Sequence, residues 1–84
     1  MKSKNKPTYD LLIKLLREAR ISKNISQAEL SNLIEADQTY ISKYETLERR
    51  IDFVEVREIC KALKIPLKDF ISSYEEELKK HGYE

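Results

Sequence analysis

Four polar residues near the middle of the chain carry the groups that hydrogen-bond to the edges of nucleic-acid bases. They are Gln38, Thr39, Ser42 and Lys43. A glutamine amide can bond adenine at two positions, a lysine ammonium can donate to guanine, and serine or threonine hydroxyls can bond several bases. If residues 38–45 are helical, Thr39, Ser42 and Lys43 fall on one side of that helix. The alternative interpretation is an ordinary solvated helix surface.

A first short helix precedes these residues. Ser26 is followed three residues later by Glu29, which is the pattern of a reciprocal capping box, so a helix is expected to begin at about Gln27. The spacing of the next apolar residues predicts one buried face, made of Leu30, Leu33 and Ile34.

A second short helix follows after a tight turn. The apolar pattern breaks at Glu35 and Ala36, and Asp37 can cap a helix over 38–45 that turns Ile41 and Tyr44 inward. Two capped helices joined by so short a turn form a helix-turn-helix. Because a short polar helix contributes little to a core, its polar face is expected to contact another molecule.

From about Leu12 to Phe70 the chain resembles the phage repressor and Cro type of helix-turn-helix regulator, also called the xenobiotic-response-element family. The likeness rests on Gln27, small Ser31 at the helix crossing, and the run from Tyr40 to Glu45 that contains Ile41. The segments 48–52 and 62–65 extend it. The resemblance implies a compact all-α bundle of about five helices. It also implies a sequence-specific regulator that binds double-stranded DNA, expected to act as a homodimer on an inverted repeat.

The resemblance, which matches Gln38, Thr39 and Lys43 to base-reading positions, and the geometry of the motif together predict roles for individual residues. Helix 38–45 would enter the major groove, with Gln38, Thr39, Ser42 and Lys43 as the base-reading residues. Phosphate contacts are expected from Gln27, Tyr40, Arg49 and Arg50. For Gln27 the alternative is a good helix former near a cap, and for Tyr40 it is simple ring packing. Arg20 and Glu45 match a structural ion pair of the family.

Three positions depart from the glycines that the family commonly has at helix ends. Glu35 and Leu47 stand where a glycine usually adopts a left-handed backbone, and Asn24 stands at a third such site. That conformation costs a residue with a Cβ roughly 1 kcal/mol, and asparagine tolerates it best. The fold assignment holds with these substitutions.

Length and composition are consistent with one small helical domain. The 84 residues include 37% charged residues, one glycine and two prolines, which favours helices throughout a single domain, 1–84. The net charge is only +1, but residues 1–50 carry +3 and residues 51–84 carry −2. No segment has the pattern of a signal peptide or membrane span, so a cytoplasmic protein without membrane contact is expected.

The remaining helices follow from caps and apolar spacing. A flexible basic arm, 1–7, with Lys2, Lys4 and Lys6, precedes a helical core of about 8–80. A helix is expected from Thr8 or Tyr9 to Ile21, with an apolar stripe so wide that either the C-terminal helix or a second subunit must cover it, and the C-terminal helix is favoured. The next helix starts after Asp52, capped with Glu55. Its expected buried face is Phe53, Val56, Ile59, Cys60 and Leu63. After Pro66, a last helix would use Leu67, Phe70, Ile71, Tyr74 and Leu78, fraying from Lys79.

Catalytic and cofactor chemistry have little support in the sequence. The single Cys60 lies on an apolar helix face and His81 lies far from it, so no metal site, catalytic group, cofactor or small-molecule ligand is expected. An antitoxin or adaptor that uses the same fold to bind a protein is the alternative to a DNA-binding regulator. The dimer surface stays open between Tyr74 with Leu78 and the broad apolar side of the first helix.

Overall fold

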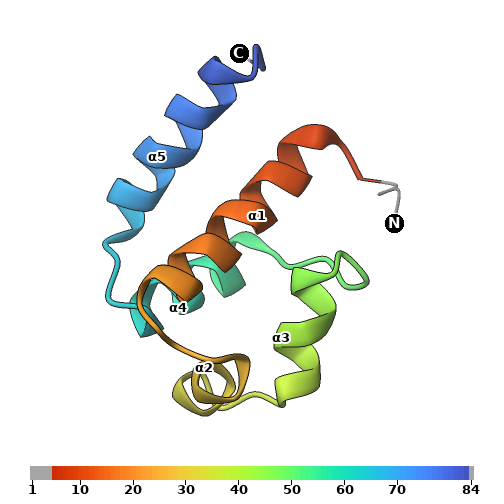
Figure 1. Ribbon diagram of the computed structural model, residues 1–84, viewed down its shortest axis with the longest axis vertical. Helices are drawn as coiled ribbons and strands as arrows, with labels where there is room; N and C mark the ends of the chain where they lie inside the picture. Colours follow the sequence, from red (N-terminus) through yellow and green to blue (C-terminus); the bar gives the residue numbers. More distant parts are fainter. Residues whose placement is uncertain (1–4, 84) are drawn as a thin grey trace.

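Five helices make up the computed structural model of the protein, which describes residues 5–83 (Figure 1). They are α1 (Pro7–Ser22), α2 (Gln27–Leu33), α3 (Gln38–Glu45), α4 (Phe53–Ala62) and α5 (Leu67–Lys80). No strand occurs in the described range, and the predicted all-α fold of about five helices is confirmed. Lys2 and Lys4 of the predicted arm lie outside the described residues.

Two helix starts use the capping boxes that the sequence predicts. The Ser26 hydroxyl accepts the Glu29 backbone N–H at 3.0 Å, and the Glu29 carboxylate accepts the Ser26 N–H at 3.0 Å. Asp52 and Glu55 make the same pair of bonds at the start of α4, at 2.8 and 3.0 Å. Each box satisfies two backbone donors that a helix start would otherwise leave unpaired.

The start of α3 differs from the expectation. Asp37 occupies the N-cap position, but its side chain accepts no capping hydrogen bond. The backbone N–H of Tyr40, which such a side chain would receive, donates to the Asp37 carbonyl oxygen instead, at 3.0 Å. The predicted side-chain cap is therefore wrong, although the helix begins where expected.

All five described helices end in the same way. The second residue beyond each helix has a positive φ, and the two backbone hydrogen bonds of a Schellman motif close the end. These residues are Asn24 (58°), Glu35 (55°), Leu47 (68°), Lys64 (60°) and Gly82 (79°). Asn24, Glu35 and Leu47 adopt the left-handed backbone that a glycine of the family usually has at these sites, and Lys64, which the sequence did not indicate, does the same. Four of the five positions thus adopt this backbone with a side chain that disfavours it.

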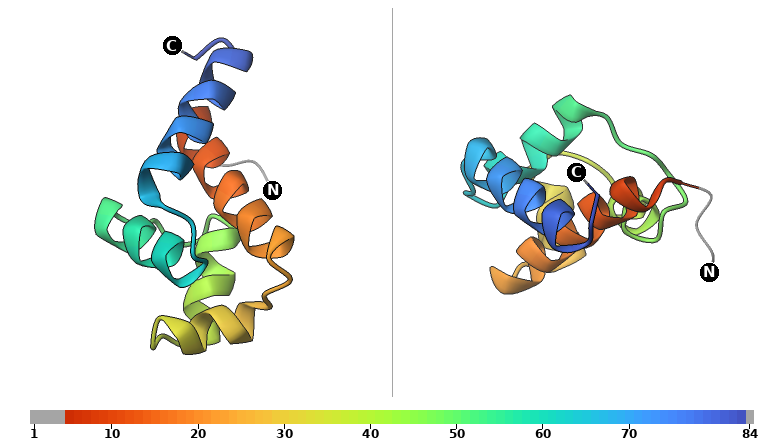
Figure 2. Two further views of the ribbon diagram at one scale, coloured as in Figure 1. Left: turned by 90° about the vertical axis from the view of Figure 1, so that its left-hand side faces the viewer. Right: turned by 90° about the horizontal axis from the view of Figure 1, so that it is seen from above.

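The core forms where α1 meets the other helices. Helix α5 runs alongside α1 in the opposite direction, while α2 and α3 form the other end of the molecule (Figures 1 and 2). The Tyr74 hydroxyl donates to the Thr8 carbonyl oxygen at 2.8 Å, which joins α5 to the first turn of α1. Helix α5 therefore packs on α1, as favoured from the sequence, and Leu11 and Ile13 of the wide apolar stripe are buried within the protomer. The buried cluster comprises Ile13, Leu16, Leu30, Ile41, Tyr44, Ile51, Val56, Ile59, Cys60, Leu63 and Phe70.

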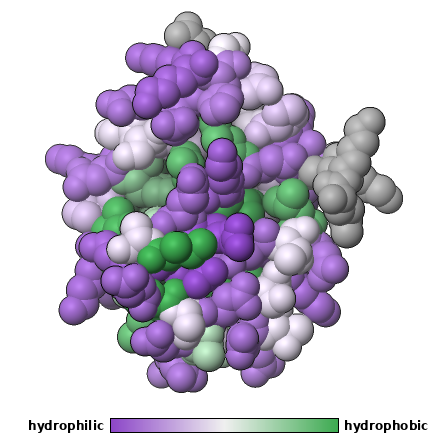
Figure 3. Space-filling view, in the orientation of Figure 1, coloured by the Kyte–Doolittle hydropathy of each residue, from purple (hydrophilic) through white to green (hydrophobic). Residues whose placement is uncertain are grey.

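Some residues predicted to be buried face solvent. Leu33 is 57% exposed and Phe53 is 62% exposed, and Ile71 is also exposed. Leu33 is the last residue of a helix of only seven, which buries Leu30 and Ser31, and Phe53 is the first residue of α4. Helix α5 also continues through Lys80 rather than fraying from Lys79. On the face shown in Figure 3, hydrophilic side chains dominate and apolar ones gather in smaller patches.

Candidate nucleic-acid interface

Helix α3 has one buried side and one polar, exposed side. Ile41 and Tyr44 are 0% exposed, so two turns of helix are fixed to the core by these side chains. Gln38, Thr39 and Lys43 are exposed. Their side chains make no hydrogen bond or ion pair within residues 5–83, and Ser42 is half-buried beside them. The side of α3 that carries the predicted base-reading residues therefore lies open to another molecule.

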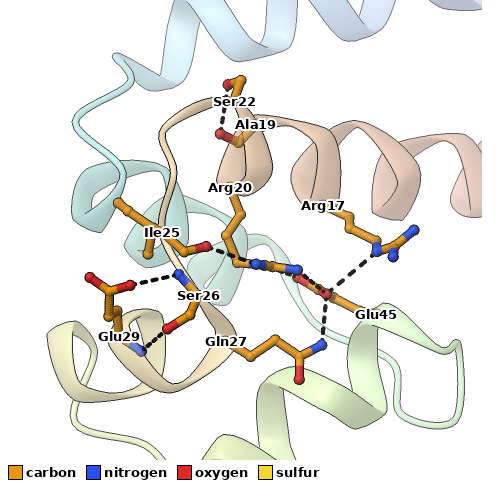
Figure 4. A network of polar contacts seen from close by, with 9 residues as sticks. All are labelled: Arg17, Ala19, Arg20, Ser22, Ile25, Ser26, Gln27, Glu29 and Glu45. Atoms are coloured by element: carbon orange, nitrogen blue, oxygen red, sulfur yellow. Dashed lines mark hydrogen bonds and ion pairs between the residues drawn. The ribbon is translucent and has the colours of Figure 1, made fainter.

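An ion pair joins the end of α3 to α1 (Figure 4). Arg20 donates through Nε to Glu45 Oε2 at 2.7 Å and through Nη2 to Glu45 Oε1 at 2.9 Å. Arg20 Nη1 also donates to the Ile25 carbonyl oxygen at 2.7 Å. The Glu45 carboxylate is only 2% exposed, and its hydrogen bond raises the pKa of the Arg20 guanidinium. Paired in this two-pronged geometry, the buried charges fix the position of α3 relative to α1.

Gln27 belongs to this same network. Its Nε2 donates to Glu45 Oε1 at 3.0 Å, from the first residue of α2 (Figure 4). A side-chain amide has two N–H donors and one carbonyl oxygen, so this bond occupies one donor and orients the group. The predicted phosphate contact of Gln27 stays a prediction. Arg17, whose Nε lies 3.8 Å from Glu45 Oε1, is a largely exposed fourth member that the sequence did not indicate.

A second polar cluster lies beside α3 and consists of Tyr40, Arg49 and Glu55. The Tyr40 hydroxyl donates to Glu55 Oε2 at 2.7 Å, and Arg49 Nη1 donates to the same oxygen at 3.0 Å. The Arg49 guanidinium lies over the Tyr40 ring, 4.5 Å from its centroid. Since a phenol has a single proton, the Tyr40 hydroxyl cannot also donate to a phosphate in this arrangement.

The ionisation of this cluster follows from its contacts. Burial and the bond to the Glu55 carboxylate raise the pKa of Tyr40, which keeps its hydroxyl protonated. Burial acts to raise the pKa of Glu55, but hydrogen bonds from Tyr40, the Asp52 backbone N–H and Arg49 outweigh it and lower that pKa. Sequence reasoning assigned Glu55 only to the capping box. Its two further contacts come from residues six and fifteen positions away, which local patterns do not reveal.

Arg50 points away from Arg49 and contacts the beginning of α1. Its guanidinium lies 4.2 Å from the centroid of the Tyr9 ring and donates to Asn5 Oδ1. The Tyr9 hydroxyl accepts the Ile51 backbone N–H at 3.0 Å. These contacts tie the segment between α3 and α4 to the start of α1. The side chain of Arg50 remains exposed, as a phosphate contact requires.

Other groups that could carry chemistry lie in the core or apart from one another. Cys60 is buried, and burial raises the pKa of its thiol to about 11. The buried Tyr44 hydroxyl has no hydrogen-bond partner within the described residues. His81 is exposed on the last turn and stacks with Tyr83. Within residues 5–83, no group of three His, Cys, Asp or Glu side chains is arranged to hold a metal, and no helix is long and apolar enough to span a membrane.

Comparison with known proteins bears on this geometry. A helix-turn-helix family model of the Cro/C1 type matches residues 16–70, which include α2, α3 and the connection between them. The chain belongs to this helix-turn-helix family. Members of the family are DNA-binding transcriptional regulators, so the resemblance and the functional class predicted from the sequence are confirmed. No sequence among curated proteins matches significantly.

Solved structures with the same fold include a controller protein of a restriction-modification system. The wild-type controller protein C.Esp1396I is 22% identical, with a TM-score of 0.81 over 88% of this chain and 95% of that chain. Its tetramer in complex with its natural 35 base-pair operator matches with the same identity and TM-score, over 97% of that chain. At this identity the likeness concerns the fold alone.

Proposed function

We propose that this protein binds double-stranded DNA sequence-specifically as a homodimer on an inverted repeat, with α3 in the major groove. The observation that carries the proposal is the division of α3 into two sides. Ile41 and Tyr44 are fully buried, whereas Gln38, Thr39 and Lys43 are exposed, and the Arg20–Glu45 pair holds the end of the helix. A DNA-binding regulator of this type would act in the cytoplasm.

The roles of the side chains differ by position. We assign base reading to Gln38, Thr39, Ser42 and Lys43, because α3 directs its amide, hydroxyl and ammonium groups outward. We assign phosphate contacts to Gln27, Arg49 and Arg50, which flank α3 and carry N–H donors. Tyr40 is the fourth predicted phosphate contact, but its hydroxyl proton is donated to Glu55. We therefore assign to its ring the role of packing against the Arg49 guanidinium.

The dimer surface that we propose only partly coincides with the residues named from the sequence. Leu78 is 9% exposed and serves the interior of one protomer, whereas Tyr74 is half-buried, donates to the Thr8 carbonyl oxygen and also lines the groove at this surface. Two exposed large apolar residues, Phe53 and Val54, are adjacent in the chain at the start of α4. Phe53 and Ile71 line one groove of about 340 Å³.

A second copy of the chain suits this α4–α5 groove. Arg50, Asp52 and Glu75 also line it, so its rim offers charges of both signs to a two-fold-related copy. The operator complex of the controller protein C.Esp1396I contains a tetramer, which shows that this fold can assemble on DNA. One motif reads few base pairs, and a dimer doubles the contact.

Selection of bound duplexes from a random pool, followed by gel-shift titration at two salt concentrations, tests the proposal. We expect an enriched site with two inverted half-sites centred about 10 base pairs apart. Binding to random duplex should fall steeply as salt rises, because phosphate contacts release counterions. Failure of the wild-type protein to retard any duplex at low salt would favour a protein-binding role for the same fold.

A further inference from the structure

Three hydrogen bonds hold the carboxylate of Glu55. Oε1 accepts the Asp52 backbone N–H at 3.0 Å, and Oε2 accepts both the Tyr40 hydroxyl at 2.7 Å and Arg49 Nη1 at 3.0 Å. The side chain is 24% exposed. A capping box needs only the first of these bonds, so the other two call for a separate explanation.

Arg49, the ion-pair partner of Glu55, lies beside α3. Arg49 follows α3 by four residues, and its guanidinium lies over the ring of Tyr40, which belongs to α3. Its side chain is 46% exposed. Among the described residues, 5–83, Arg49 donates through Nη1 alone, to Glu55 and to the Arg50 carbonyl oxygen, which leaves the donors on Nε and Nη2 for an outside acceptor.

Resting on the function proposed above, we propose that Glu55 is a positioning residue that limits backbone affinity. It fixes the Arg49 guanidinium beside α3 and at the same time compensates its charge. A phosphate at this place meets both the guanidinium and a carboxylate about 3 Å behind it, so its net attraction is smaller than a free arginine would give.

This compensation has a consequence for target search. Phosphate contacts carry no sequence information, and they supply most of the affinity for random DNA. A genome presents a vast excess of random sites over operators. The Glu55 carboxylate orients the Arg49 guanidinium and offsets its positive charge. It therefore helps to hold α3 in position on the duplex while it weakens binding to DNA of random sequence.

The decisive experiment is a double-mutant cycle of Glu55→Gln with Arg49→Ala, measured as dissociation constants on random and selected duplexes across a salt series. Glutamine retains an oxygen for the Asp52 N–H, so the capping box persists, and thermal melting checks the fold. Glu48→Gln is the matched control, since it removes an exposed carboxylate from the same connection. Glu55→Asp is a second variant, in which the side chain is one methylene shorter and the carboxylate therefore lies farther from Arg49.

We expect Glu55→Gln to lower the dissociation constant about five-fold on both duplexes at low salt. The salt slope should steepen by up to about one. Glu55→Asp should give a smaller gain. In the Arg49→Ala background the effect of Glu55→Gln should shrink to that of Glu48→Gln, because the arginine through which it acts is gone.

Several outcomes would overturn the inference. Unchanged or weaker binding by both Glu55 variants would show that the carboxylate only supports the fold. If Glu55→Gln increased DNA affinity equally with and without Arg49, the effect of Glu55 would be a general effect of charge and would not act through Arg49. Neither result touches the proposed function, which fails separately if the wild-type protein binds no duplex at all.

Discussion

Arg20 and Glu45 lie 25 positions apart in the chain, yet two hydrogen bonds of 2.7 and 2.9 Å join them. This pair connects the last turn of α1 to the last residue of α3. Because the Glu45 carboxylate is almost completely removed from solvent, the geometry of the reading helix depends on a charge that only Arg20 fully compensates.

Arg20→Ala is expected to lower the free energy of unfolding by about 3 to 5 kcal/mol, because it leaves a buried carboxylate without its partner. Urea and thermal unfolding measure the change. Arg17→Ala is the control: Arg17 is 60% exposed and lies 3.8 Å from Glu45, so its loss should cost less than about 1 kcal/mol. An unchanged transition for Arg20→Ala would remove the structural role of the pair.

Lys43→Ala or Gln38→Ala should weaken binding to the selected site by about 1 to 3 kcal/mol and relax the preference at one base position. Binding to random DNA should change less, since these side chains read base edges. Fluorescence anisotropy on both duplexes, with the exposed Lys61→Ala on α4 as control, distinguishes the roles. Equal losses on both duplexes for Lys43→Ala and Gln38→Ala would argue against base reading.

Phe53→Lys should weaken self-association at least about ten-fold, because a two-fold interface at the α4–α5 groove would bring two like charges together. Phe53 lines the groove and is 62% exposed, so the fold of the protomer should tolerate the change. Leu33→Lys is matched in exposure, at 57%, but lies at the end of α2, outside the α4–α5 groove. Analytical ultracentrifugation that shows the same oligomeric state for both variants would place the dimer surface elsewhere.

Lys64→Gly should stabilise the protein by up to about 1 kcal/mol, because Lys64 holds a φ of 60° that glycine adopts without a steric penalty. Glu35→Gly, at 55°, should act in the same direction. Ser72→Gly, at an exposed position inside α5, provides the contrast and should destabilise by about 0.5 to 1 kcal/mol. Lower melting temperatures for both end-of-helix glycines would contradict the strain argument.

Stability should fall in acid partly through Glu55. Its pKa in the folded protein lies below the ordinary 4.5, so the carboxylate stabilises the fold above that value, and this contribution disappears as the pH falls through the folded-state pKa. The difference in unfolding free energy between the wild type and Glu55→Gln should therefore be constant near neutrality and narrow below about pH 4.5. If the difference in unfolding free energy did not depend on pH, ionisation of Glu55 would make no contribution to the stability of the fold.

Local patterns predicted the elements well, because capping and helix ends depend on neighbouring residues. The capping pairs Ser26 with Glu29 and Asp52 with Glu55 mark two helix starts, and the residues of each pair are only three positions apart in the chain. Burial at helix ends was predicted less well. Leu33 continues the apolar spacing of α2, but the helix stops there, and periodicity alone does not show that the neighbouring elements leave that last position open.

The sequence by itself determined five helices, a helix-turn-helix and the polar side of α3, since these follow from short-range hydrogen bonding and apolar spacing. Only the tertiary structure decided that Glu55 meets Tyr40 and Arg49, that Gln27 joins the Arg20–Glu45 pair, and that Phe53 and Val54 remain exposed. These contacts arise when helices distant in the chain pack together, and the charges and shapes that meet there depend on the whole fold rather than on any one segment.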